Sequence, residues 1–312
     1  MSIVFKGVMK IIISVKDMQE WANNTRKAGK KIVFVPTMGF LHEGHLALMR
    51  EGRSRGDYLV VSIFVNPTQF GVGEDYEDYP RDLEGDAEKI SSAGGDIIFA
   101  PSAKEMYPAE YQTFVAVERV TQNLCGASRP THFRGVTTVV AKLFNIVKPH
   151  VAIFGEKDYQ QLITIRQMTR DLNFDIEIVG MPTIREKDGL AMSSRNKYLS
   201  SEERKQALCL FNALNQAEKL FRGGERNSKN LIDIATEIIH AQPAAIIDYV
   251  KICHPETIEN LNWIDDKALM ALAVKIGKTR LIDNRVLKKL SKGGFSRAKN
   301  YAPIKNPSGD GN

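Results

Sequence analysis

Two histidines, His42 and His45, lie three residues apart where an apolar run ends and a helical pattern begins. The apolar run, Ile32 to Val35, is typical of a short buried strand, so the chain turns sharply from strand to helix before the histidines. The first N–H groups of a helix lack intrahelical partners and lie at the positive end of its dipole, where they bind anionic oxygens. Imidazole adapts its charge to such ligands. The pattern predicts a phosphate site at this corner.

The histidine pair has two competing interpretations. An HxxH pair on a helix is as often structural as functional, and neutral imidazole is also a common zinc ligand. Against zinc, helical ligand pairs usually lie four residues apart, and the nearest cysteine is Cys125. The turn before the pair, Pro36 to Gly39, favours a ligand site because glycine permits close backbone approach.

A second candidate is Lys157, in the segment Gly155 to Asp158 that follows the apolar run Val151 to Phe154. An ammonium group at the start of the next helix would balance phosphate oxygens, and the glycine would let the backbone approach them. A lysine in a solvated turn is the alternative. The buried strand before it favours the functional interpretation.

A third candidate is the small-residue loop Asp188 to Asn196, which contains Ser193, Ser194 and Arg195. Two hydroxyls and a guanidinium form a flexible donor set that could close over a triphosphate and follow charge onto the leaving pyrophosphate. Taken alone, the segment is equally an ordinary loop. Together with the histidine corner upstream, it predicts adenylyl transfer.

Four nearly continuous apolar runs must carry these segments, and helical patterns alternate with them. Unbroken runs of Val, Ile and Phe are typical of parallel strands that are buried on both faces. Ligands bind at the carboxyl ends of such strands, so the polar segments after the runs should converge on one cleft. The predicted fold is an α/β, Rossmann-like parallel sheet domain with right-handed crossovers. The runs are Lys31–Val35, Leu59–Val65, Val151–Phe154 and Phe174–Val179, with a further strand at Asp96–Ala100 and helices at His42–Arg55, Asp82–Ala93, Gly135–Val147 and Asp158–Asp171.

The pattern changes after about residue 182. Ser200 and Glu203 form a candidate capping box that opens a helix to about Phe221, and a second helix is expected over 228–240. Three segments are expected to form antiparallel strands, at 246–252, 268–277 and 279–283. The sequence thus predicts a Rossmann-like domain at 1–182, a second, smaller α+β lid domain at 183–287 and a basic, disordered tail at 288–312.

Composition excludes several classes of protein. The 312 residues are 43% hydrophobic and 26% charged, which is ordinary for one large or two modest domains. No apolar run approaches the ~20 residues of a membrane span, and no signal peptide is expected because the apolar tract at Ile11–Ile13 is short. The three cysteines, Cys125, Cys209 and Cys253, are odd in number and far apart, which favours a reducing cytoplasm.

The net charge of +6 is concentrated in the tail. From Lys288 onward six basic residues and one acid give +5, so the other 287 residues carry only +1. A polyanion-binding role is the alternative to a solvated tail, and it predicts affinity for nucleic acid that falls steeply with salt. The body of the protein is not a basic surface, so no nucleic-acid partner is expected.

Six segments resemble one known family in the same order and spacing. They are PTMGFLHEGH, VSIFVNPTQFG, YPRDLEGD, ASRPTHFRGV, FGEKDYQQL and DGLAMSSRNKYL, and the likeness extends from Lys10 to Asn284. The chain is thereby similar to the pantothenate synthetase (pantoate:β-alanine ligase) family. The resemblance implies that ATP and pantoate give pantoyl adenylate and pyrophosphate, after which β-alanine attacks the adenylate to give pantothenate and AMP. Another HxGH-type nucleotidyltransferase, transferring adenylyl or cytidylyl groups, is the alternative.

The resemblance also implies roles for the site residues. His45 would donate a proton, His42 would bind phosphates, Lys157 would neutralise charge on the α-phosphate, and Arg195 would hold the β and γ phosphates. Adenylation needs no enzyme nucleophile, because the substrate carboxylate attacks phosphorus. The implied ATP site comprises Met38, Gly39, Phe40, Leu41, His42, Glu43, Gly44, His45, Gly155, Glu156, Lys157, Asp158, Ile184, Met192, Ser193, Ser194 and Arg195.

Further residues are implied to bind the acid and the metal. Neutral amides donate hydrogen bonds without pairing ionically with a carboxylate, which leaves the carboxylate nucleophilic. Asp86 would lie near Mg²⁺, which keeps several waters and binds mainly through ATP phosphates. The acidic segment Gly71 to Pro80 would form a lid that excludes water. The residues implied to bind pantoate or β-alanine are Gln69, Gln161, Pro36 and Thr37.

The resemblance completes the set of expected partners. It implies a homodimer, and with the cysteine usage it predicts an enzyme of the cytoplasm. The other expected partners are the small molecules ATP, pantoate and β-alanine, with no membrane. Family members typically begin near Met9 of this sequence.

Overall fold

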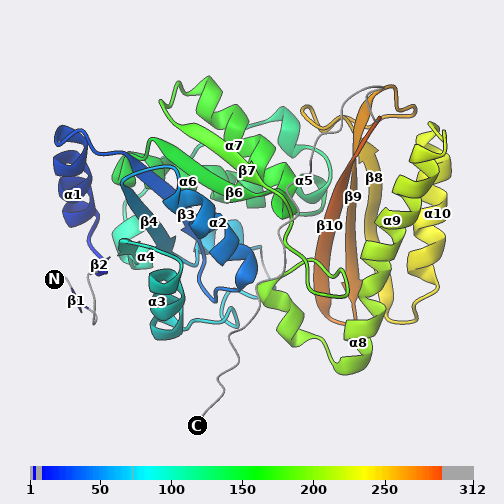
Figure 1. Cartoon of the computed structure of the whole chain (residues 1–312), viewed down its shortest axis with the longest axis horizontal. Coiled ribbons are helices and arrows are strands. Elements are labelled where there is room, and N and C mark those ends of the chain that lie inside the picture. Colours follow the sequence, from blue (N-terminus) through cyan, green and yellow to red (C-terminus); the bar gives the residue numbers. More distant parts are fainter. Residues whose placement is uncertain (1–2, 5–8, 72, 290–312) are drawn as a thin grey trace, which may run out of the picture.

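A mostly parallel sheet is the centre of the larger part of the chain (Figure 1). The computed structural model describes residues 3–4, 9–71 and 73–289, and within these seven strands form one sheet in the order β1-β2-β5-β4-β3-β6-β7. Strand β1 pairs antiparallel with β2, and the other six are parallel. The bounds are β1 (Ile3–Val4), β2 (Lys10–Ile12), β3 (Ile32–Thr37), β4 (Tyr58–Ile63), β5 (Ile97–Phe99), β6 (Val151–Gly155) and β7 (Glu177–Met181).

Alternate residues of the central strand enter two different cores. Ile32 and Phe34 of β3 belong to one core, and Val33 and Val35 belong to the other, because successive side chains of a strand point to opposite faces. Helices α1, α6 and α7 cover the first face, and α2 and α3 cover the second. The prediction of a sheet buried on both faces is therefore confirmed. The bounds are α1 (Val15–Lys27), α2 (Glu43–Arg53), α3 (Leu83–Ser92), α6 (His132–Val147) and α7 (Tyr159–Asp171).

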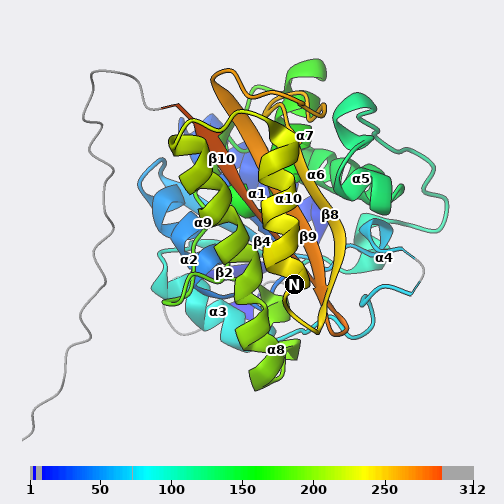
Figure 2. The ribbon, with the colours of Figure 1, turned by 90° about the vertical axis from the view of Figure 1, so that its right-hand side faces the viewer.

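A smaller unit follows the large sheet, as the sequence predicted. Three antiparallel strands form a sheet in the order β10-β9-β8. Helices α9 and α10 cover the face of this sheet that points away from the large sheet (Figures 1 and 2). The bounds are α8 (Ser201–Gln206), α9 (Leu208–Arg222), α10 (Ser228–His240), β8 (Ala245–Cys253), β9 (Lys267–Ile276) and β10 (Thr279–Lys288).

The helix expected from Ser200 to Phe221 is two helices. The capping box of Ser200 and Glu203 is present, and it starts α8. A single residue, Ala207, ends α8 and begins α9. Its N–H bonds to the Glu203 carbonyl at 2.8 Å and its carbonyl accepts from Leu210 at 3.3 Å, so the turn tightens from α to 3₁₀ spacing at this point.

Helix α1 was not predicted from the sequence, and three strand ends were predicted wrongly, one of them that of β10, which continues past Asp283 to Lys288. Helix α1 buries only Met18, Ala22 and Thr25, which is too few apolar positions for a clear helical period. Strand β7 begins at Glu177 rather than near Phe174, because Asn173 adopts a positive φ of 54° and the next residues are loop. Strand β4 stops at Ile63, ahead of a 3₁₀ turn that contains a proline.

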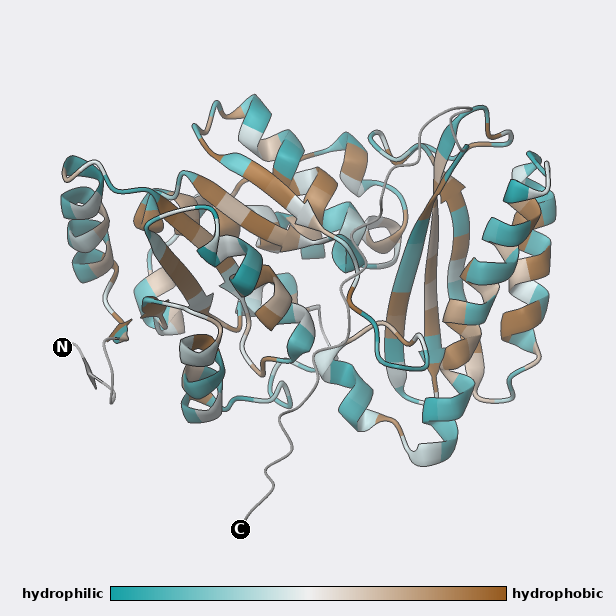
Figure 3. Ribbon diagram, in the orientation of Figure 1, coloured by the Kyte–Doolittle hydropathy of each residue, from teal (hydrophilic) through white to brown (hydrophobic). Residues whose placement is uncertain are grey.

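A third apolar cluster joins the two units. Leu269 and Ala271 of β9 pack with Val120, Leu124 and Ile163 of the larger unit. Figure 3 shows brown, apolar residues along the strands of the large sheet and on patches of the helices.

No helix in the described ranges is long and apolar enough to cross a membrane. The expected disordered tail lies almost wholly outside those ranges. The short helices are η1 (Pro67–Gln69), α4 (Ala103–Met106), η2 (Arg119–Thr121), α5 (Cys125–Ser128), η3 (Glu156–Asp158) and η4 (Ser194–Tyr198).

Replacing Leu59 of β4 by alanine should destabilise the larger unit by about 2–5 kcal/mol, because the side chain is fully buried and a cavity would remain. The matched control is Leu172→Ala, since that leucine is 50% exposed, and it should cost less than about 1 kcal/mol. Both variants are made in a Trp263→Phe background, so that the fluorescence of Trp21 in α1 reports the unfolding of this unit in urea. Equal losses for the two variants would contradict the assignment of the core.

Candidate active site

A cavity of about 1330 Å³ lies between the carboxyl edge of the large sheet and the small unit. Its walls come from the segments after β3, β4, β6 and β7, together with residues of β8, β9 and β10. The four polar segments that the sequence placed at strand ends therefore converge as expected. The small sheet closes the cavity from the other side.

The two histidines begin helix α2 and bond to its first turn. His42 is the N-cap residue, and its Nδ1 accepts from the N–H of Gly44 at 3.1 Å. Nδ1 of His45 accepts from the N–H of His42 at 3.4 Å, and the ring centroids lie 4.1 Å apart. An Nδ1 that accepts leaves the proton of a neutral ring on Nε2. Both rings therefore keep Nε2–H as a donor for a ligand.

Both imidazoles are neutral at physiological pH. Burial, then the charge of Lys157, lowers the pKa of His42 to about 4, although the charges of Asp158 and Glu186 act to raise it. Burial, then the nearby His42 and Lys157, lowers the pKa of His45 to about 3. The corner thus presents neutral N–H donors to an anion, and the ammonium of Lys157 supplies a positive charge beside them.

Asp86 holds the backbone of this corner. Its Oδ2 accepts from the N–H of Phe40 at 2.6 Å, and its Oδ1 accepts from the N–H of Leu41 at 2.7 Å. Burial raises the pKa of this carboxyl despite the two N–H bonds. Asp86 does not line the cavity, and no group of three or more His, Cys, Asp or Glu in the described residues is arranged to hold a metal ion. The expectation that Asp86 lies at the magnesium does not fit this geometry.

The turn before α2 needs a special backbone. Gly39 and Phe40 have positive φ values of 83° and 50°. A Cβ on Gly39 would lie 3.0 Å from Oδ2 of Asp86 and 3.0 Å from Ile63, so glycine is required by both conformation and space. The buried carboxylate therefore fixes a strained turn that carries the histidines.

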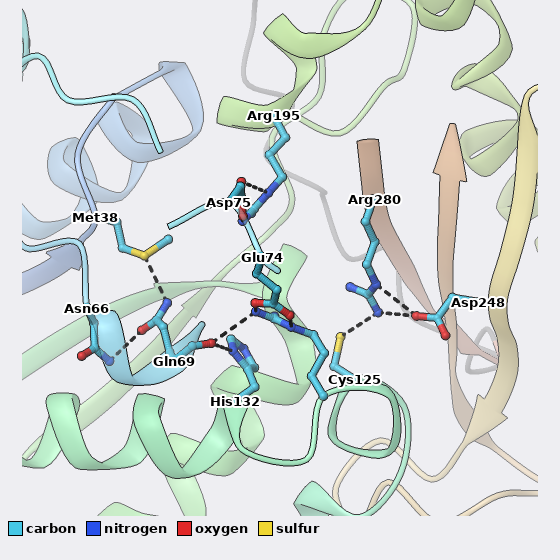
Figure 4. Close-up of polar contacts among 11 residues, drawn as sticks. Met38, Asn66, Gln69, Glu74, Asp75, Cys125, His132, Arg195, Asp248 and Arg280 are labelled. Atoms are coloured by element: carbon cyan, nitrogen blue, oxygen red, sulfur yellow. Dashed lines mark hydrogen bonds and ion pairs between the residues drawn. The ribbon is translucent and has the colours of Figure 1, made fainter. Parts of the chain in front are cut away.

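Arg195 is already paired with an acid in this structure (Figure 4). Its Nε and Nη2 lie 3.0 and 2.8 Å from the two carboxylate oxygens of Asp75. Asp75 belongs to the segment 71–80 that the sequence suggested as a lid. Oγ of Ser193 accepts from the N–H of Arg195 at 3.3 Å, and Oγ of Ser194 donates to the carbonyl of Phe40 at 3.4 Å. The serine-arginine loop thus contacts both the histidine corner and the lid segment.

Gln69 is held in a fixed orientation at the end of β4 (Figure 4). Its Oε1 accepts from Asn66 at 3.1 Å, and its Nε2 lies 3.1 Å from the sulfur of Met38. Because the oxygen is occupied by a donor, the NH₂ group is the part available to an acid substrate. The Nε2 group of Gln69, the glutamine expected to bind substrate, is therefore held in one orientation.

Two residues at the start of α6, Arg129 just before the helix and His132 at its first position, secure the main chain of Gln69. The carbonyl of Gln69 lies 2.8 Å from Nδ1 of His132 and 3.3 Å from Nη2 of Arg129. Burial, then Arg129, lowers the pKa of His132 to about 4, so the neutral ring donates through Nδ1. Nε of Arg129 also pairs with Glu74 of the lid segment at 2.6 Å. Gly135 leaves no room for a side chain, because a Cβ there would lie 2.2 Å from the carbonyl of Thr68.

Most of the expected site residues line the cavity, and six lie outside its lining. Glu43 is exposed and pairs with Arg50, so its side chain faces solvent. Leu41 is buried in the core beside α2. The residues outside the lining are Gly39, Phe40, Leu41, Glu43, Glu156 and Asp86, and those that line it are Pro36, Thr37, Met38, His42, Gly44, His45, Gln69, Gly155, Lys157, Asp158, Gln161, Ile184, Met192, Ser193, Ser194 and Arg195.

Several residues of the site were missed from the sequence. Arg129 and His132 stand in the segment ASRPTHFRGV, three residues apart before an apolar helix, and that spacing was a usable signal. Asn66 follows a strand and precedes a proline, which was a second signal. No sequence signal marked Asp248 and Arg280 of the small sheet, which form an ion pair at 2.7 Å beside Cys125 at the cavity wall (Figure 4).

The stability of the protein should fall as the pH drops from about 6.5 toward about 4. The unfolded histidines, with the ordinary pKa of 6.5, bind protons that the folded His42 and His45 do not bind, so the unfolded state gains protons in this window. Each histidine contributes a slope of at most about 1.4 kcal/mol per pH unit. His45→Gln should remove one such contribution in urea unfolding. The exposed His240→Gln is the control, and an unchanged slope in His45→Gln would contradict the neutral assignment.

Comparisons with known proteins agree with this geometry. The family model described as pantoate-beta-alanine ligase matches residues 10–286. The pantothenate synthetases of Geotalea uraniireducens and Geobacter sulfurreducens are each 61% identical over 279 residues, which is 89% of this chain and 99% of theirs.

Solved structures show the same likeness. The pantothenate synthetase of Thermus thermophilus superposes with a TM-score of 0.85 at 45% identity, covering 89% of this chain and 99% of that one. The pantoate-beta-alanine ligase of Francisella tularensis, solved with beta-gamma ATP and beta-alanine, gives a TM-score of 0.75 at 36% identity, covering 90% and 98%. The chain therefore belongs to the pantoate-beta-alanine ligase family.

Proposed function

We propose that the protein joins pantoate to β-alanine with ATP, forming pantothenate, AMP and pyrophosphate through a pantoyl adenylate. One observation carries the proposal. A single cavity brings the anion corner of His42 and His45 together with Lys157 and with the substrate amides of Gln69 and Gln161. Family membership supports it, and the Francisella relative was solved with an ATP compound and β-alanine.

The first step is adenylation of the acid. A carboxylate oxygen of pantoate attacks the α-phosphorus, and pyrophosphate leaves with the electron pair of the broken P–O bond. The protein supplies no nucleophile, so its contribution is positioning and charge stabilisation. Lys157 would balance charge on the α-phosphate, while Nε2–H of His42 and His45 would donate to phosphate oxygens. The family role of His45 as proton donor is compatible with a neutral ring that carries its proton on Nε2.

The second step is amide formation. The neutral amine of β-alanine attacks the acyl carbon of the adenylate, the C–O bond to phosphate breaks, AMP leaves with the electron pair, and the nitrogen releases one proton. Gln69 would hold pantoate through the Nε2 N–H that does not point at the sulfur of Met38, since Asn66 occupies the amide oxygen. Gln161 lines the same cavity on the first turn of α7, whereas the neighbouring Gln160 is buried and donates to the carbonyls of Val120 and Asn123.

Mg²⁺ would enter with ATP rather than occupy a protein cage. The described residues contain no metal-ligating cluster, and Glu74 and Asp75 are engaged with arginines. This arrangement fits an ion held mainly by phosphates and water, as Mg²⁺ prefers. The ion would withdraw charge from the phosphate oxygens.

Arg195 would hold the β and γ phosphates only after sharing or leaving its partner Asp75. Tyr79 of the same lid segment is 5% exposed, and its ring lies 5.9 Å from the guanidinium carbon. The segment 71–80 would therefore move when ATP binds and would exclude water from the adenylate once closed.

The assembly and location follow the family resemblance and the cysteine usage. We propose a homodimer in the cytoplasm. Cys125, Cys209 and Cys253 are all free thiols and all buried, which is compatible with a reducing compartment.

The proposed reaction predicts pyrophosphate exchange into ATP that depends on pantoate. Exchange requires reversible formation of the acyl adenylate, so it should proceed without β-alanine and stop without pantoate. Label transfer from pyrophosphate to ATP measures it directly. Exchange that is independent of pantoate, or equally supported by nicotinate nucleotide or phosphopantetheine, would instead favour another nucleotidyltransferase.

Lys157→Ala and His45→Ala should each slow this exchange by roughly 10²–10³-fold, the scale of losing one charge-stabilising donor. Matched controls are Lys16→Ala and His240→Ala, which lie at exposed helix positions and do not line the cavity. Thermal unfolding of each variant separates lost folding from lost catalysis. Rates near those of the wild type for both site variants would remove the assigned roles.

A further inference from the structure

Asn284 of β10 reaches from the small unit into the turn that carries Lys157. Its Nδ2 donates to the carbonyl of Glu156 at 2.9 Å and to the carbonyl of Lys157 at 2.9 Å. A side-chain amide has two N–H donors, so both are used on this turn. The contacts join the main chain of one unit to a side chain of the other.

The turn is the three-residue helix η3, which joins the end of β6 directly to the start of α7. A Cβ built on Gly155 would meet nothing within 4 Å, so the cavity side of the turn is open space. Nζ of Lys157 lies 4.0 Å from Asp158, a separation too long for a firm hydrogen bond. The position of the ammonium therefore depends on how the main chain is held.

Asn284 is itself firmly placed. Its N–H donates to Oδ1 of Asp283 at 2.8 Å, and Asn284 is only 9% exposed. Asp283 is 3% exposed and receives both Nη groups of Arg185, at 2.6 and 2.9 Å. Arg185 also donates to the carbonyl of Gly189 at 3.0 Å. A buried, bidentate ion pair thus orients the strand residue that holds the turn.

We propose that Asn284 is a positioning residue for Lys157 in the adenylation step, so that a docked small unit is required to place the catalytic ammonium. The inference rests on the proposed function. Asn284 lines the cavity, but its two donors are spent on main-chain carbonyls, so it acts through Lys157 and not by binding a phosphate.

A second contact between the units provides a matched control. Nδ2 of Asn123 donates to Oδ1 of Asn260 at 2.8 Å and to the carbonyl of Ile258 at 2.9 Å. Asn260, like Asn284, therefore joins the small unit to the larger one through an asparagine amide. It does not line the cavity and does not contact the Lys157 turn. If these asparagines only docked the small unit, substituting either one would lower the exchange rate. If Asn284 positions Lys157, only the substitution of Asn284 should lower it.

The test is a double-mutant cycle on pantoate-dependent pyrophosphate exchange. Asn284→Ala should lower kcat by about 10- to 100-fold, since a displacement of about 1 Å costs that much, while KM for ATP and for pantoate changes less than about threefold. In the Lys157→Ala background the same substitution should change kcat less than about threefold, because the residue it positions is gone. Asn260→Ala should change kcat less than about threefold in both backgrounds.

A second variant keeps the test decisive if Asn284→Ala folds poorly. Asn284→Asp has the same size but presents carboxylate oxygens to two carbonyl oxygens. It should therefore lose exchange at least as severely as Asn284→Ala. The comparison uses protein whose thermal midpoint matches that of Asn260→Ala. Equal factors for Asn284→Ala in the two backgrounds, or near-normal kcat for Asn284→Asp, would overturn the proposal. Failure of the proposed function looks different, because the wild type would then show no pantoate-dependent exchange or Lys157→Ala would keep it.

Discussion

The contact between the buried carboxylate of Asp86 and the N–H groups of Phe40 and Leu41 is the interaction on which the site depends. A buried charge is costly unless it is hydrogen-bonded, and here each oxygen accepts a short N–H bond. Lys89 adds a positive charge 3.9 Å from the carboxylate and donates to the Leu41 carbonyl at 3.1 Å. Helix α3 thereby fixes the strained turn from β3 into α2, and the histidines that follow take their places from it.

The charges at the cavity follow a second principle. Arg129 and Arg195 are each neutralised by an acid of the segment 71–80, and the imidazoles near the phosphate corner are neutral. Lys157 lies 4.0 Å from the carboxylate of Asp158, so its charge is less closely paired than those of the two arginines. It therefore keeps a positive charge on a turn that the small sheet holds. Charge placement and docking of the small unit are thus linked at a single short segment.

Local patterns explain what the sequence predicted well. Helix α10 spans the predicted 228–240, and the capping box of Ser200 and Glu203 was correct, because both depend on residues within a few positions of each other. The parallel strands were predicted because burial on both faces leaves unbroken apolar runs. Helix α1 was missed because it buries few apolar residues.

The contacts that organise the site were not predictable in this way. Phe40 and Asp86 are 46 positions apart, Asp75 and Arg195 are 120, and Glu156 and Asn284 are 128. No periodicity or spacing connects residues at such separations, so their pairing is decided only by the tertiary fold. The family resemblance placed Asp86 near Mg²⁺, whereas in the fold that side chain accepts from two backbone N–H groups.

The neutral imidazoles have a consequence for the heat of nucleotide binding. A triphosphate placed against His42 and His45 favours the charged form of each ring, so the low pKa values of the free protein rise when ATP binds. If the raised pKa of a histidine reaches the working pH, its ring takes up a proton from the buffer. The enthalpy observed on binding then includes the ionisation enthalpy of that buffer, and titrations in two buffers of different ionisation enthalpy count the protons taken up by the histidine corner.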